Sequence, residues 1–268
     1  MFYRQFFSFS IGLMLLLVSS ISQAVQPANM TIKDIAKCMR VNVFERGAIR
    51  DFQIKAYDRE GKSSKLKFKA FWKPSKDQQE IRLTLQVLEP KSLQGTAYLV
   101  TKNAQQHKLY LYLPALKRVR TINGGEASQK LWGSDFTIAD IEQIQGLLID
   151  GESRRLNDQT LLDRPVYVIE TQTNDNQNGY TKVRSYIDQQ SCLIFKAELF
   201  STGDQPHKVL TADTSTLLEI DPWWLVQGYR MQDFQNGTRT ELWMSDIFIQ
   251  ERLPETLFTP QGFFIEQE

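Results

Sequence analysis

The chain has 268 residues, 41% of them hydrophobic, which is enough for a substantial core. Its 32 Lys and Arg residues nearly balance its 31 Asp and Glu residues, so it lacks the clustered basic excess that nucleic-acid binding requires. Beyond the N-terminus, no apolar run reaches the roughly 20 residues that cross a membrane. Length alone allows one all-β domain or two smaller domains.

The first 24 residues have the pattern of a secretory signal peptide. Arg4 is their only charged side chain, residues 6–18 are apolar, and Ser22-Gln23-Ala24 places small residues at the −3 and −1 positions of a cleavage site. A retained anchor helix is the alternative, but the apolar run is short for a membrane span. No Cys follows the cleavage site, which argues against a lipid anchor. We therefore expect a soluble mature domain of residues 25–268, beginning at Val25, in the periplasm.

Two cysteines, Cys38 and Cys192, remain in the mature chain. In an oxidising compartment such a pair commonly forms a disulfide, which here would tie the N-terminal segment to a distant strand. Two buried free thiols are the alternative. His107 and His207 are isolated and lack ligand spacing, so we predict solvated histidines and no metal or other cofactor.

Residues 31–39 are predicted to form a helix, because apolar residues recur at positions 32, 35, 36 and 39. Thr31 can cap its N-terminus, and Asp34 occupies the capping-box position three residues later. The other side of this helix is charged, so the apolar face should pack against the rest of the protein.

From residue 51 onward the hydrophobic period changes to two, which is typical of half-buried antiparallel strands. Turn-forming residues separate the segments. A mainly β fold is therefore predicted, with one large curved antiparallel sheet or half-open barrel of about eleven strands. The expected strands are residues 51–58, 65–72, 81–87, 96–102, 108–113, 165–171, 180–188, 192–201, 208–217, 228–233 and 238–250.

The alternation stops between residues 114 and 158. Residues 137–148 there are predicted to be helical, with Thr137 as the cap, Asp140 at the third helical position and a stripe formed by Ile138, Ile141, Ile144, Leu147 and Leu148. A helix inserted midway through a meander must cover an open face of the sheet, because its stripe would otherwise stay in water.

The sequence contains no nucleophile elbow, phosphate-binding loop or dinucleotide fingerprint. Asp135 and Asp140 have a spacing more typical of helix caps than of acid–base catalysis. A hydrolase that uses two carboxylates stays open, since spatial proximity is invisible in a sequence. We therefore predict a protein that is not an enzyme.

Two motifs carry a resemblance to a known family. They are Tyr110-Leu111-Tyr112-Leu113-Pro114-Ala115-Leu116-Lys117-Arg118-Val119-Arg120 and Trp132-Gly133-Ser134-Asp135-Phe136-Thr137. With the signal peptide and the meander, they resemble the LolA-like outer membrane lipoprotein-sorting family, in its branch associated with RND/MMPL exporters. The resemblance implies a half-open barrel whose hydrophobic cavity is closed by a lid made of the helices at 31–39 and 137–148.

The function implied is that of a monomeric periplasmic carrier. It would hold an acyl chain of a lipoprotein or lipid and transfer it toward the outer membrane, with an RND/MMPL-type transporter as partner. An RseB-like envelope sensor or adaptor is the alternative, because one fold supports both roles. Two helices cover many strands, which favours an incompletely filled cavity, although a plain packed core is equally consistent with the residues.

Alternation and the helical stripe select the candidate cavity residues. They are Leu66, Phe68, Ala70, Trp72, Ile81, Leu83, Leu85, Val87, Leu109, Leu111, Leu113, Ile138, Ile141 and Ile144. Trp223 and Trp224 could rim the opening, although a buried structural role fits indoles better.

Arg118, Arg120, Asp135 and Phe136 mark the motif and lid region. The arginines are expected on the wet face of a strand or paired with Asp135, since Arg–carboxylate pairs commonly fix loops. Direct binding of a lipid headgroup is the alternative.

Overall fold

The computed structural model describes residues 30–42, 47–74, 81–103, 107–122, 128–144, 146, 148, 150–173, 179–221, 223–249 and 252–265. The expected signal peptide, its cleavage site and Val25 lie outside these residues. Within the described ranges, no helix has the length and apolar character needed to cross a bilayer.

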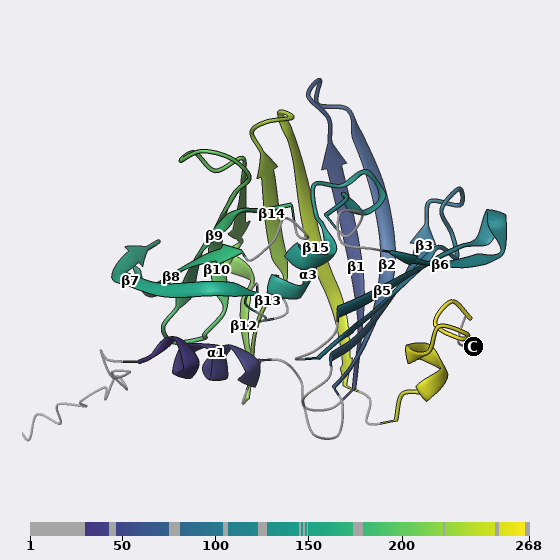
Figure 1. Cartoon of the computed structure of the whole chain (residues 1–268), viewed down its shortest axis with the longest axis horizontal. Helices are drawn as coiled ribbons and strands as arrows, with labels where there is room; N and C mark the ends of the chain where they lie inside the picture. Colours follow the sequence, from purple (N-terminus) through teal and green to yellow (C-terminus); the bar gives the residue numbers. More distant parts are fainter. Residues whose placement is uncertain are drawn as a thin grey trace, which may run out of the picture.

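One antiparallel sheet of 13 described strands forms the body of the molecule and curves around a short central helix (Figure 1). Its strands are β1 (Ala48–Tyr57), β2 (Ser63–Pro74), β3 (Ile81–Glu89), β4 (Ala97–Lys102), β5 (His107–Leu113), β6 (Arg118–Ile122), β7 (Gly151–Leu161), β8 (Arg164–Thr173), β9 (Lys182–Asp188), β10 (Ile194–Phe200), β11 (Lys208–Ala212), β14 (Gly228–Asp233) and β15 (Thr238–Ile249). This confirms the mainly β, half-open architecture predicted from the alternation of apolar and polar residues.

The order of the strands explains why a segment must cross the sheet. The order is β6-β5-β4-β3-β2-β1-β15-β14-β11-β10-β9-β8-β7, so β15 joins two meanders through its pairing with β1. The edge strands β6 and β7 are consecutive in the sequence, and residues 123–150 connect them. Because this connection must pass from one edge of the sheet to the other, it can cover the face that it crosses.

The strand count differs from the prediction of about eleven. Strand β7 was not predicted, because its sequence is largely polar and its side chains are mostly exposed, as suits an edge strand. The expected strand at 208–217 ends at Ala212, and β12 (Leu217–Ile220) and β13 (Trp223–Val226) form a separate hairpin.

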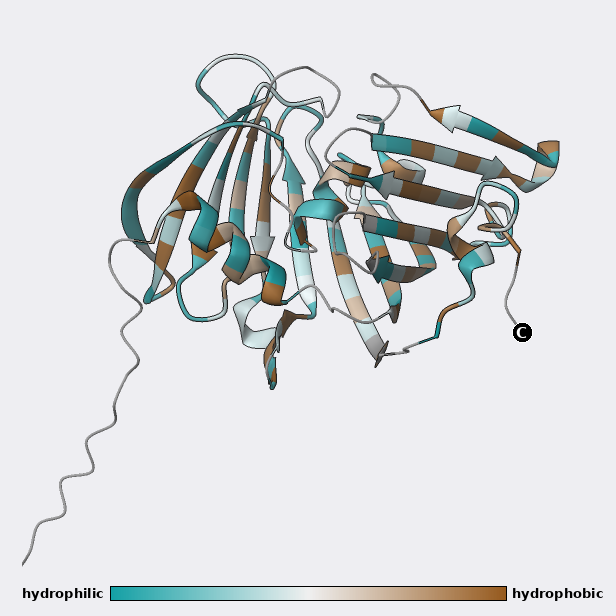
Figure 2. Cartoon of the chain, turned by 60° about the horizontal axis from the view of Figure 1, so that its bottom comes forward, coloured by the Kyte–Doolittle hydropathy of each residue, from teal (hydrophilic) through white to brown (hydrophobic). Residues whose placement is uncertain are grey.

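Two faces of the sheet can be distinguished by what covers them. The inner face contacts helices α1 (Ile32–Val41) and α3 (Ile138–Ile144), and its side chains belong to one large buried cluster. Apolar and polar residues alternate along the strands, which sends apolar side chains inward (Figure 2). Both helices begin as predicted, because Thr31 and Asp34 form a capping box, as do Thr137 and Asp140.

The outer face of β2–β5 is covered by the C-terminal segment, residues 252–265. Leu257, Phe258 and Phe263 pack there against Phe71 and Leu99. Thr84 donates to the Leu257 carbonyl at 2.5 Å, and Gln86 donates to the Phe263 carbonyl at 2.7 Å. This strap stabilises one half of the sheet from outside and leaves the inner face to α1 and α3.

A disulfide joins Cys38 of α1 to Cys192 before β10. It confirms the pairing favoured from the sequence. The bond spans 154 residues of sequence and fixes α1 over the half of the sheet that contains β7–β10.

Candidate functional site: the inner face and its lid

The inner face is covered at its centre by residues 128–144, which we call the lid. The lid contains the short 3₁₀ helix η2 (Leu131–Gly133) and α3. All seven residues of α3 are buried, which is unusual for a surface helix with one apolar stripe. The lid therefore inserts into the curve of the sheet as well as lying across it.

Most of the candidate cavity residues meet beneath the lid. Leu111 and Leu113 are half-buried, and the side chain of Ile81 lies outside the described part of the chain. Because register pairs Leu111 with Tyr98 and Tyr98 with Leu85, these side chains share the inner face. The buried members of the cluster are Leu66, Phe68, Ala70, Trp72, Leu83, Leu85, Val87, Leu109, Ile138, Ile141 and Ile144.

Trp132 is the main aromatic contact of the lid. Its ring centroid lies 5.5 Å from that of Phe68 and 5.3 Å from that of Tyr98. Phe68 in turn stacks on Phe52 at 4.8 Å. The backbone of Trp132 has a positive φ of 48°, which is unfavourable for a bulky side chain by about 1–3 kcal/mol. The contact with the inner face therefore holds this residue in a strained conformation.

Asp135 anchors the start of the lid through buried polar contacts. Its carboxylate lies 2.8 Å from Lys130 Nζ, and it accepts hydrogen bonds from Thr238 at 2.6 Å and Thr240 at 2.9 Å. The ammonium of Lys208 also donates to the Asp135 backbone carbonyl at 2.8 Å. The expected arginine pairing is thus replaced by Lys130 and the two threonines. Phe136 beside it is fully buried.

Asp140 ties α3 to the opposite half of the sheet. Its carboxylate oxygens lie 2.9 and 3.0 Å from the hydroxyl of Tyr180, next to β9. Burial raises the pKa of Asp140, against the opposing charge of Lys208. Burial, together with the Asp140 carboxylate, raises the pKa of Tyr180 well above its usual value.

Glu142 ties the other side of α3 to β4 and β5. Its carboxylate lies 3.5 Å from Lys102 Nζ and 3.1 Å from His107 Nε2, so His107 contacts the lid and is not merely solvated. Burial alone would raise the pKa of Glu142, but His107 and Lys102 outweigh it and hold the pKa below its usual value.

Gln143 is the exception among the polar residues of the lid. Its side chain is 2% exposed, and neither the amide nitrogen nor the amide oxygen has a hydrogen-bond partner among the described residues. Such a group costs about 1–3 kcal/mol when it is buried. The closed position of the lid therefore contains a local penalty.

Little empty volume remains under the closed lid. A cavity of about 70 Å³ lies at the β4–β6 edge and is lined by Tyr98, Leu109, Leu111, Arg120, Ile122, Gln129, Leu131 and Ile138. A smaller space of about 10 Å³ lies near Ile144 and Arg50. An acyl chain can therefore occupy the inner face only if the lid is displaced.

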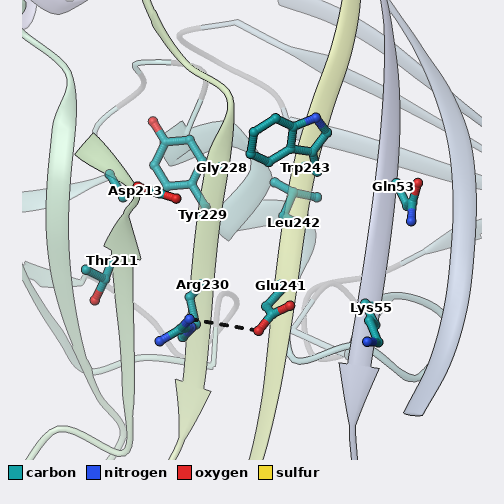
Figure 3. A pocket seen from close by; sticks show the side chains of 11 residues that line it. Gln53, Lys55, Thr211, Asp213, Gly228, Tyr229, Arg230, Glu241, Leu242 and Trp243 are labelled. Atoms are coloured by element: carbon teal, nitrogen blue, oxygen red, sulfur yellow. Dashed lines mark ion pairs between the residues drawn. The ribbon is translucent and has the colours of Figure 1, made fainter. Parts of the chain in front are cut away.

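A larger pocket, of about 610 Å³, lies on the strands β11, β14, β15 and β1 (Figure 3). Much of its lining is polar: it includes Gln53, Lys55, Thr211, Asp213 and the Arg230–Glu241 ion pair at 3.9 Å. A Cβ on Gly228 would lie 3.2 Å from the Trp243 ring, so this close approach needs glycine. This open, charged surface is poorly suited to an acyl chain.

Arg118 and Arg120 are exposed, as expected, but they share a face with apolar residues. Register pairs Leu113 with Arg118 and Leu111 with Arg120, which places both arginines on the inner-face side of the edge strand β6. Residues opposite one another on neighbouring strands project to the same side. The intervening Val119 packs with the outer-face cluster.

Arg50 is an inner-face residue that the sequence did not single out. It is buried near Tyr229, and burial lowers the pKa of its guanidinium to about 10. Its place at the start of β1, before the predicted strand, concealed it. Trp223 and Trp224 are half-buried and pack against the inner cluster, and the Trp224 amide donates to Asn42 Oδ1 at 2.7 Å.

Comparison with known proteins defines the family and the fold. Residues 80–263 match the model of a family described as uncharacterized proteins. The chain belongs to this family. No curated protein matches the sequence significantly.

Solved structures show that the fold is LolA-like. An outer membrane lipoprotein-sorting protein domain from Vibrio parahaemolyticus is similar with a TM-score of 0.75 and 24% identity, over 86% of this chain and 97% of that one. A DUF1329 family protein from Desulfovibrio piger gives 0.74 and 21%, over 84% and 95%. A LolA superfamily protein from Nitrosomonas europaea gives 0.65 and 18%, over 86% and 98%.

Proposed function

We propose that the protein is a periplasmic carrier that binds an acyl chain on its inner face and moves it through water toward the outer membrane. The observation that carries the proposal is the composition of the lid. It covers a continuous apolar surface, yet it brings Asp140, Glu142 and the unpartnered Gln143 into the interior. A permanent core element would place apolar residues at such positions.

The energetics favour exchange between lid and ligand. Strain at Trp132 and the buried amide of Gln143 each weaken the closed state by about 1–3 kcal/mol. Each CH₂ of an acyl chain transferred from water gains about 0.8 kcal/mol. A chain of about a dozen methylenes can therefore replace the lid on the inner face. The lid would close again over the empty sheet after release.

The role needs no catalytic group, and the lipoprotein-sorting relative of the same fold is named for a related task. A transporter partner of the RND/MMPL type, implied by the sequence resemblance, belongs to this proposal. The protein would act as a monomer between donor and acceptor membranes.

The experiment compares two buried leucines on opposite faces. Leu85 lies on the inner face, Leu99 lies on the outer face under the C-terminal strap, and both are 0% exposed. Leu85→Gln is expected to abolish uptake of a fluorescent fatty-acid probe, whereas Leu99→Gln, with a similar loss of stability, should retain it. Circular dichroism checks that both variants fold.

A lid variant supplies a second, opposite readout. Ile141→Ala removes apolar contact between α3 and the inner face, so it should increase probe uptake. Equal uptake by all three variants and the wild type would contradict the inner face as the binding surface.

A further inference from the structure

The open edge of the inner face carries positive charge. Arg118 and Arg120 lie on the edge strand β6, opposite Leu113 and Leu111 of β5. Among the described strands, β6 has no neighbour on its other side. The two guanidinium groups therefore stand where the apolar surface meets water.

Arg120 also contributes to the cavity at this edge. The cavity of about 70 Å³ is otherwise lined by apolar side chains of β5, β6 and the lid, together with Tyr98 and Gln129. No carboxylate is present among the described residues that line it. An apolar hollow that ends in a cationic side chain fits a molecule with an apolar body and an anionic end.

We propose that Arg118 and Arg120 bind the anionic headgroup of the cargo while its acyl chain lies along the inner face toward Leu85. This inference rests on the carrier function proposed above and names its cargo class. Arginine recognises phosphate and carboxylate groups through paired, charge-assisted hydrogen bonds. The cargo is then an anionic amphiphile, such as a phospholipid, a lysophospholipid or a fatty acid. The uncharged diacylglyceryl group of a lipoprotein would leave the arginines without a ligand.

The test uses two ligands that differ only in the phosphate. Myristoyl lysophosphatidic acid and monomyristoylglycerol have the same chain and glycerol unit, and each is titrated below its critical micelle concentration. The wild-type protein is expected to bind the phosphate-bearing ligand at least about tenfold more tightly, with a preference that falls as salt rises. Arg118→Gln/Arg120→Gln should remove this preference and leave the affinity for monomyristoylglycerol within about twofold.

Lys108→Gln is the matched control. Lys108 is an exposed basic residue of the same strand pair, but it alternates with Leu109 and so faces away from the lid. This variant should keep the full preference. Because all these positions are exposed, loss of folding is an improbable explanation of a changed ratio, and thermal unfolding checks it.

The outcomes separate this inference from the carrier function. Equal affinity of the wild type for both ligands, or an unchanged ratio in the double variant, overturns the headgroup site and leaves the carrier standing. Failure of the wild type to bind either ligand overturns both proposals. Glycerol phosphate without a chain distinguishes the source of the anion: weak binding supports a lipid headgroup, and binding equal to that of the lysolipid supports a site for free phosphate compounds.

Discussion

The hydroxyl of Tyr180 lies 2.9 and 3.0 Å from the two carboxylate oxygens of Asp140, and this pair connects the wall of the sheet to the lid helix. Both groups are buried, and Lys208 Nζ lies 3.4 Å from the same hydroxyl. A buried polar contact of this kind is specific in geometry and weak in net energy. It suits a lid that must close in one position and still open.

Tyr180→Phe is expected to loosen the lid. The variant removes the donor and leaves the buried Asp140 carboxylate with fewer partners, which should lower the free energy of unfolding by about 1–3 kcal/mol. Hydrogen exchange should accelerate at α3, including the Ile141 amide, which donates to the Thr137 carbonyl. Tyr167→Phe is the control, because the Tyr167 hydroxyl bonds only to the weak acceptor sulfur of Met30 in the described chain. Exchange at α3 that is equal in both variants would show that the Tyr180–Asp140 pair does not hold the lid.

Glu142→Gln tests the other side of α3 through pH. Since Lys102 and His107 hold the pKa of Glu142 below its usual value near 4.5, the ionised group stabilises the fold above about pH 4.5, and this contribution is lost as the pH falls through the lowered pKa. The variant should therefore be less stable than the wild type by about 2 kcal/mol at neutral pH. The difference should shrink in acid.

Urea unfolding from pH 7 to pH 3 measures this difference. Glu89→Gln is the control, since Glu89 forms an exposed ion pair with Lys67 that is worth at most about 0.5 kcal/mol. A gap between the wild type and Glu142→Gln that stays constant across the range would refute the role assigned to the Glu142 carboxylate.

Removal of the disulfide should destabilise the protein strongly. The bond closes a loop of 154 residues, for which the chain-entropy model gives roughly 5 kcal/mol. Cys38→Ala/Cys192→Ala should unfold at much lower denaturant concentration than the oxidised wild type, and α1 should become accessible to proteases. Reduced wild type should behave like the variant, and an unchanged midpoint would contradict the prediction.

The C-terminal strap should affect stability without affecting binding. Phe263 is fully buried against the outer face, so Phe263→Ala should cost about 3–5 kcal/mol. Uptake of the fatty-acid probe should persist wherever the variant is folded. Loss of uptake by folded Phe263→Ala would mean that the outer face takes part in binding.

Much of the fold follows from local patterns in the sequence. Thr31 with Asp34 and Thr137 with Asp140 predict both helix starts, because a capping box lies within four residues. Alternation predicts most strands of the sheet, since half-buried strands have a period of two. The strand β7 escapes prediction because an exposed edge strand such as residues 151–161 needs no apolar alternation.

The site is less accessible from sequence, because its decisive contacts are distant. The ammonium of Lys208 reaches the carbonyl of Asp135 across 73 residues, and Thr240 reaches its carboxylate across 105. The inner placement of Arg118 and Arg120 depends on the register of β6 against β5, which alternation alone leaves undetermined. The cavity residues were selected correctly as a face, but their dense packing under the lid depends on tertiary structure.

The most direct test of the carrier function is the cargo itself. The mature protein would be purified from the periplasm without detergent, extracted with organic solvent and analysed by mass spectrometry. We predict an acyl lipid in stoichiometric amount, which Leu85→Gln loses and Leu99→Gln keeps. A lipid-free protein that also takes up no fatty-acid probe would contradict the account and leave the inner face as a permanently filled core.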